Sequence, residues 1–261
     1  MPETDNSNPV LEVNNLTKHF PVTSSFLGRT VGHVRAVEDV SFTINQGETL
    51  GLVGESGSGK STVGKVVLRL LEATNGQVKL HGEDITHVSG QRLRDTRKRM
   101  QMVFQDPYAS LNPRLSAGET IMEPLENYQN ISKAQRVDRA TELLDRVGLR
   151  HDALKRYPHE FSGGQRQRLG VARALALNPS VIVADEPVSA LDVSVQAQVL
   201  NLLIRLQKEL NLTYLFVSHD LAVVEHISHR VAVMYLGHIV ELADKESLFS
   251  DARHPYTEAL L

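Results

Sequence analysis

Short apolar segments alternate with helical patterns along most of the chain. Four segments are nearly continuous in apolar residues, which is typical of strands covered on both faces of a sheet. They are Thr49–Val53, Met100–Phe104, Val181–Ala184 and Tyr214–Val217. Two further segments, Ser61–Leu71 and Val195–Leu210, carry apolar residues at helical spacing. Strands that alternate with helices in this way predict a mostly parallel α/β core.

The remaining pattern predicts smaller β parts and a helical insertion. Extended segments are expected at 10–13 and 34–44, and a strand pair at 231–235 and 239–242. The mixture of Pro, Ser, Gly and Thr from Pro21 to Gly32 predicts a loop, and Asn75-Gly76 predicts a hairpin turn. From about Ile121 to Leu177 the pattern is helical, rich in charges and poor in strand formers, which indicates an inserted helical subdomain.

Composition narrows the class of protein. The 261 residues are 41% hydrophobic and 23% charged, which is typical of a globular chain. A formal net charge of −3 argues against a nucleic-acid protein held by a large basic excess. The sequence has no cysteine, which excludes disulfides, Cys-ligated zinc, iron–sulfur clusters and a Cys nucleophile for this chain. With a polar start and no membrane-length apolar run, the expectation is a cytosolic-type protein.

The segment from Gly54 to Ser61 matches the phosphate-loop pattern G-x-x-x-x-G-K-S/T between a predicted strand and a predicted helix. Glycines let the backbone N–H groups turn toward phosphate oxygens, and the helix adds its positive dipole end. Lys60 is placed to reach the β- and γ-phosphates, and the Ser61 hydroxyl to bind Mg²⁺. A glycine-rich turn without a ligand is the alternative. The expected nucleotide-binding residues here are Gly54, Glu55, Ser56, Gly57, Ser58, Gly59, Lys60, Ser61 and Thr62.

The predicted strand at 181–184 ends in two carboxylates. Asp185 is placed to hold Mg²⁺ directly or through water, and Glu186 to orient or deprotonate the attacking water. A solvated acidic strand end is the alternative, but the phosphate loop favours the catalytic interpretation.

A third run, Ser162-Gly163-Gly164-Gln165, begins a helical pattern and offers a second anion site. An ordinary helix cap by Ser162 is the alternative. Together with the phosphate loop, the run resembles the signature sequence of ABC-transporter ATPases.

Other motifs of that family follow in matching order. Gln105 resembles the Q-loop glutamine, Ser189-Ala190-Leu191-Asp192 the D-loop, and His219 the switch histidine. Phe20 resembles the aromatic residue that stacks on adenine, with an ordinary core position as its alternative.

The resemblance implies a P-loop, RecA-like α/β core with an antiparallel β part and an inserted helical subdomain. It also implies ATP and Mg²⁺ as ligands, with Ser61, Gln105 and Asp185 as the metal set. Two such domains pair head to tail, and each ATP lies between the phosphate loop of one subunit and the Ser162–Gln165 segment of the other, with Asp192 nearby. Glu186 is then the general base, and His219 contacts the γ-phosphate.

The expected domains follow the same resemblance. Residues 10–105 and 178–235 form the two parts of the core, and 106–177 form the helical signature subdomain. Residues 236–261 begin a C-terminal extension, and residues 1–9 are disordered.

Three segments resemble the ATP-binding subunits of the oligopeptide/dipeptide (peptide/nickel/opine) importers, namely Met102–Arg114, Tyr157–Glu160 and His254–Leu261. The resemblance implies a peripheral protein at the cytoplasmic face of the inner (plasma) membrane. Its implied partners are a second ATPase subunit, identical or paralogous, two transmembrane permease subunits and, indirectly, an extracytoplasmic solute-binding protein. Chains of this subfamily usually continue past the His-Pro-Tyr-Thr segment, so any role of an extension stays open.

Three other classes compete with this interpretation. A soluble ABC ATPase acting on nucleic acid or the ribosome usually carries coiled coils, zinc cysteines or two cassettes. An ABC exporter ATPase is disfavoured by the importer-like segments. A P-loop kinase or GTPase would leave the Ser-Gly-Gly run unexplained, and the sequence has no N-K-x-D run.

Overall fold

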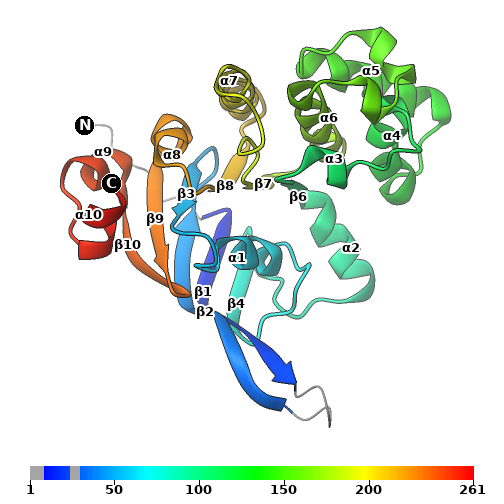
Figure 1. The fold of residues 1–261 in the computed structure, drawn as a ribbon. Helices are drawn as coiled ribbons and strands as arrows, with labels where there is room; N and C mark the ends of the chain where they lie inside the picture. The colour runs from blue at the N-terminus through cyan, green and yellow to red at the C-terminus, as the bar shows by residue number, and fades with distance from the viewer. Residues whose placement is uncertain (1–8, 24–29) are drawn as a thin grey trace. The chain divides into compact units, whose positions relative to one another are not determined.

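The computed structural model describes residues 9–23 and 30–261, with the elements labelled in Figure 1. The chain divides into two compact units. The first contains the described residues up to Leu93 together with Thr213–Leu261, and the second contains Arg94–Leu212. Helix α2 (Gly90–Arg99) contains the boundary. The finer division expected from the motifs stays a prediction. The expected disorder at 1–9 lies, apart from Pro9, outside the described residues.

Two sheets are built from the described strands of the first unit. One is antiparallel, with the order β2-β1-β4-β5. In the other, β3 pairs in parallel with β8 and β9, and β10 pairs antiparallel with β9. The strands are β1 (Leu11–Thr23), β2 (Thr30–Ile44), β3 (Thr49–Val53), β4 (Asn75–Leu80), β5 (Glu83–Asp84), β8 (Thr213–Val217), β9 (Arg230–Tyr235) and β10 (His238–Asp244). The helices are α1 (Lys60–Val67), α8 (Leu221–Ile227), α9 (Lys245–Ser250) and α10 (Pro255–Leu260).

The central strands are buried along their whole length, as their apolar runs predict. All five residues of β3 and all five of β8 are buried. Each fully buried Val, Leu or Ile contributes roughly 1.5–3 kcal/mol of transfer free energy. This core fixes the carboxyl ends of β3 and β8, from which the phosphate loop and His219 continue.

The loop expected from Pro21 to Gly32 is wrong at both of its ends, where strands continue, and its middle, residues 24–29, lies outside the described residues. Strand β1 continues to Thr23 and β2 begins at Thr30, with Pro21 opposite His33. The pairing of β1 with β4 ends at Thr17. Beyond that residue, up to Thr23, β1 pairs with β2 and no longer with β4. A proline is tolerated there because its missing N–H breaks no second ladder.

The hairpin turn expected at Asn75-Gly76 is also wrong, because β4 begins at Asn75. A Cβ added to Gly76 would lie 2.4 Å from the Asn15 carbonyl oxygen of β1, and the φ of Gly76 is +92°. The glycine therefore allows a close backbone approach between two strands, which in sequence is easily mistaken for a tight turn.

The second unit joins a parallel strand pair to a group of helices. Its strands are β6 (Met100–Val103) and β7 (Val181–Asp185), which pair in parallel. Its helices are α3 (Pro107–Ser110), α4 (Ala117–Tyr128), α5 (Lys133–Arg146), η1 (His151–Lys155), η2 (Pro158–Glu160), α6 (Gly163–Leu175) and α7 (Val193–Leu210). Capping boxes begin α4, α5 and α6, because Ser at the N-cap is followed by Glu or Gln three residues later. The helical character expected from 121 to 177 is confirmed.

Over residues 9–23 and 30–261, no helix combines the length and the apolar character that crossing a bilayer requires.

Candidate functional site

The phosphate loop leaves the end of β3 and runs directly into α1, as its motif predicts. Gly59 is the N-cap residue of α1 and has a φ of +109°. A Cβ added there would lie 2.2 Å from the Ala36 carbonyl oxygen of β2. Glycine suits this position because a side chain would be strained and would clash there, and no side chain of the described residues caps the first turn of α1. Helix ends of this kind bind phosphate through backbone N–H groups.

Lys60 lies inside the loop and is only 4% exposed. Its Nζ donates hydrogen bonds to the carbonyl oxygens of Gly54 at 2.6 Å and Glu55 at 2.7 Å. The Ser58 hydroxyl lies 3.4 Å from the same nitrogen. The two loop carbonyls orient this buried ammonium, and the third N–H, which makes the longer contact to Ser58, is placed to turn to a phosphate oxygen, which accepts a stronger charge-assisted hydrogen bond.

His219 lies at the same edge of the first unit as the phosphate loop. Strands β3 and β8 are parallel neighbours with Leu52 opposite Val217, so both chains leave the sheet on one side. Asp220 caps α8 by accepting hydrogen bonds from the N–H groups of Ala222 and Val223. His219 lies between the end of β8 and Asp220 at the start of α8, and its side chain is exposed. Carboxyl ends of parallel strands are the usual place for ligands in such sheets.

Phe20 is half-buried on β1, opposite Val34 of β2. The Nζ atom of Lys18 lies 5.0 Å from the centroid of its ring. Ala36, whose carbonyl lies against Gly59, is two residues further along β2. The structure therefore places the expected adenine-stacking residue on the hairpin that contacts the phosphate loop.

In the second unit, the acidic strand end and the Q-loop residue lie together. Asp185 ends β7 and is 6% exposed. Glu186 follows with a φ of +46°, in the left-handed region that is uncommon for residues with side chains. Its Oε2 accepts a hydrogen bond from the Gln105 Nε2 at 2.9 Å. This bond brings together the expected general base and the expected Q-loop glutamine, which are 81 positions apart in sequence.

The signature segment packs against the D-loop and α7 within the same unit. Ser162 caps α6, and Gln165 completes the capping box. A Cβ added to Gly163 would lie 3.2 Å from Leu191, and one added to Gly164 would lie 2.3 Å from Val195. Asp192 is the N-cap residue of α7. The small residues of the signature thus allow α6 to approach the D-loop closely.

Replacing Gly164 with Ala is expected to destabilise the protein by about 1–3 kcal/mol, because the new methyl group overlaps Val195. The matched control is Gly170→Ala in the same helix, where an added Cβ meets no atom of the described residues within 4 Å outside the helix backbone. That change is expected to stabilise by about 0.5–1 kcal/mol, because it restricts the unfolded chain and favours helix. Urea unfolding of both variants measures the difference, and equal shifts would contradict the packing described here.

Helix α6 also holds the residues around Gln105, which the motifs did not predict. Arg166 lies over the Tyr108 ring at 5.1 Å, and Arg173 Nη1 donates to the Ser110 carbonyl at 2.6 Å. Arg173 and Arg166 are seven residues apart, a spacing that places both on one helix face. This seven-residue spacing of two arginines was the signal in the sequence that could have pointed to them. Burial lowers the pKa of Arg173, but its guanidinium stays charged at neutral pH.

The expected site residues are divided between the two units. The first unit contains Gly54–Thr62, His219 and Phe20. The second unit contains Gln105, Asp185, Glu186, Asp192 and Ser162–Gln165.

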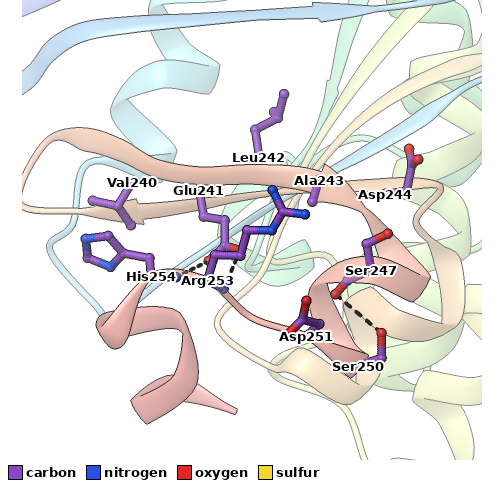
Figure 2. Close-up of a pocket in the computed structure, with 10 residues that line it drawn as sticks. All are labelled: Val240, Glu241, Leu242, Ala243, Asp244, Ser247, Ser250, Asp251, Arg253 and His254. Carbon is purple, nitrogen blue, oxygen red and sulfur yellow. Dashed lines mark hydrogen bonds between the residues drawn. The ribbon is translucent and has the colours of Figure 1, made fainter.

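A cavity of about 730 Å³ lies elsewhere in the first unit, between β10, α9 and the residues before α10. Figure 2 shows its lining, which includes no residue of the phosphate loop.

Comparison with known proteins gives concordant matches. The family profile described as ABC transporter matches residues 37–189. The chain is 59% identical over 255 residues to the probable peptide ABC transporter ATP-binding protein y4tS of Sinorhizobium fredii, covering 98% of this chain and 72% of that protein. It is 56% identical over 257 residues to the oligopeptide transport ATP-binding protein AppF of Bacillus subtilis, covering 98% and 78%.

Solved structures agree with these matches. The ATP-binding cassette MJ0796, a dimer in a post-hydrolysis state bound to ADP and Pi, superposes with a TM-score of 0.79 at 30% identity. The superposition covers 90% of this chain and 98% of that one. The likeness confirms the α/β fold expected from the motifs.

Proposed function

Because this chain belongs to the ABC transporter family, we propose that it is the ATP-hydrolysing subunit that energises an importer of peptides or related small solutes. The observation that carries the ATPase function is the phosphate loop, where buried Lys60 lies against the loop carbonyls at the end of β3. The names of y4tS and AppF support di- or oligopeptides as the solute class.

Hydrolysis needs a water molecule aimed at the γ-phosphate and a group that accepts its proton. Glu186 is the proposed general base, and the hydrogen bond from Gln105 holds its carboxylate in one orientation. Lys60 stabilises negative charge on the β- and γ-phosphates, and His219 contacts the γ-phosphate. Phe20 stacks on the adenine ring. These roles rest on the motifs and on the local geometry of each unit.

Mg²⁺ fits the donor set proposed for it. Ser61 supplies a hydroxyl, Gln105 an amide oxygen and Asp185 a carboxylate, all hard oxygen donors of the kind that magnesium prefers. Protein sites usually hold this ion through one or two carboxylates together with the substrate phosphates. When bound, the ion neutralises charge on the phosphates.

The working form is proposed to be a head-to-tail dimer around two ATP molecules. The Ser162–Gln165 segment then meets the nucleotide on the phosphate loop of the other subunit, with Asp192 of the D-loop beside it. The exposed N-terminal end of α6 supports this role, since Ser162 and Gly163 are accessible on the surface of their unit. Dimeric MJ0796 is a structural precedent.

The membrane partners are proposed to dock beside the Q-loop residue. Tyr108 is 59% exposed and Phe104 is 38% exposed, so two aromatic rings next to Gln105 lie at the surface. Arg166 and Arg173 of α6 lie over these rings at 5.1 and 5.6 Å, linking them to the signature helix. A permease subunit bound here would place this chain at the cytoplasmic face of the inner membrane.

Uptake of a labelled di- or oligopeptide by cells lacking this chain tests the proposal. Restoring the wild-type chain is expected to restore uptake, whereas the Glu186→Gln chain is expected to restore none. Unchanged uptake in the deleted cells, combined with ATP hydrolysis stimulated by DNA or ribosomes, would instead support the soluble ABC ATPase class.

A further inference from the structure

The short C-terminal helix α10 is tied to strand β10 through one carboxylate. The Glu241 Oε1 accepts the Arg253 N–H at 2.9 Å, and its Oε2 accepts the His254 N–H at 3.1 Å. Figure 2 shows Arg253 and His254 gathered beside Glu241. Burial raises the pKa of this carboxyl, but the hydrogen bonds on it outweigh burial, so its pKa lies below the ordinary value. The start of α10 is therefore fixed to the sheet of the first unit.

Tyr256, in the first turn of α10, contacts the phosphate loop. Its backbone N–H donates to the His254 Nδ1 at 3.1 Å, which caps the helix. Its hydroxyl oxygen accepts a hydrogen bond from the backbone N–H of Glu55 at 3.1 Å. Its ring lies on that of Tyr235, at the end of β9, with centroids 4.3 Å apart. The ring and the hydroxyl thus make two different contacts. A Tyr-to-Phe change removes the hydroxyl contact and keeps the ring contact.

The peptide that Tyr256 contacts is one that also holds Lys60. The N–H of Glu55 and the C=O of Gly54 belong to the same planar peptide unit. The Tyr256 hydroxyl binds its N–H, and the Lys60 Nζ binds its C=O at 2.6 Å. Rotation of this plane would move the oxygen that holds the ammonium. Hydrogen bonds in such a chain also polarise one another, so each strengthens the next.

We propose that Tyr256 is a positioning residue for Lys60, acting through the Gly54–Glu55 peptide, so that the C-terminal helix contributes to nucleotide affinity. The inference rests on the proposed ATPase function and extends it to a residue outside the expected site. The hydroxyl keeps the loop in the conformation that encloses the ammonium. The Glu241 carboxylate keeps the hydroxyl in place by fixing the start of α10.

The test compares Tyr256→Phe with Tyr235→Phe, which removes a hydroxyl from the other ring of the same pair. One lost hydrogen bond corresponds to about a 2- to 10-fold rise in the Kd and KM for ATP in Tyr256→Phe, with kcat unchanged. Tyr235→Phe is expected to leave the Kd and KM for ATP at wild-type values. Glu241→Ala is expected to raise the Kd in the same direction, since it releases the start of α10. Urea unfolding shows whether each variant is folded.

Two outcomes would overturn the inference. In one, Tyr256→Phe binds ATP as tightly as the wild-type chain. In the other, Tyr235→Phe weakens binding as much as Tyr256→Phe does, which would indicate a general effect of the ring pair. Failure of the wild-type chain itself to bind or hydrolyse ATP would instead contradict the proposed function, so the two failures are distinguishable.

Discussion

Replacing Glu186 with Gln is expected to lower the rate of ATP hydrolysis by about 10²–10⁴-fold while leaving the Kd for ATP near its wild-type value. The amide has nearly the shape of the carboxylate, and its oxygen can still accept the hydrogen bond from Gln105. It cannot accept a proton from the attacking water. Phosphate release and nucleotide binding, measured on the same preparation, separate the two effects.

The same variant is expected to accumulate as an ATP-bound dimer, since the dimer is held by nucleotide that is no longer hydrolysed. Light scattering with and without ATP detects this change in mass. Glu209→Gln, an identical substitution at an exposed position of α7, is the matched control and is expected to hydrolyse ATP normally. Hydrolysis by Glu186→Gln at the rate of this control would show that another group is the base.

Replacing Lys60 with Ala is expected to raise the Kd for ATP by about 10- to 100-fold, because charge-assisted hydrogen bonds to phosphate contribute roughly 1.5–3 kcal/mol each. The change removes a buried ammonium from the centre of the phosphate loop. Equilibrium binding of a fluorescent ATP analogue measures the affinity, and circular dichroism verifies that the variant is folded.

Lys65→Ala is the control for this loss of charge, since Lys65 is exposed in the last turn of the same helix. It is expected to bind ATP as the wild-type chain does. Equal affinities for Lys60→Ala and the wild-type chain would mean that the loop does not hold the phosphates.

The apolar runs predicted the strands that position the site, because strands buried on both faces need apolar residues at every position. The sequence was less informative where backbone geometry decides the structure. Pro21 and Gly76 are usually signs of loops and turns, but here they lie in strands, for reasons that depend on neighbouring strands. Such tertiary contacts have no local signal.

The candidate site also has a part that could be predicted from sequence and a part that could not. The phosphate loop, Asp185, Glu186 and the signature run were recognisable because their chemistry needs those residue types at fixed spacing. The hydrogen bond from Gln105 to Glu186 agrees with that reasoning. Tyr256 could not be assigned a role from sequence, since its contact with Glu55 spans 201 positions and is formed only when α10 docks.

In the proposed dimer, the chain is an ATPase whose site is completed by a second subunit. The most direct test is phosphate release per mole of purified chain, measured over a range of protein concentrations with Glu186→Gln in parallel. The rate per mole of the wild-type chain is expected to rise with protein concentration, and the rate is expected to be lost in Glu186→Gln. A chain that releases no phosphate at any concentration, even when co-expressed with a second ATPase subunit and the permease, would contradict an ATPase site completed by a second subunit.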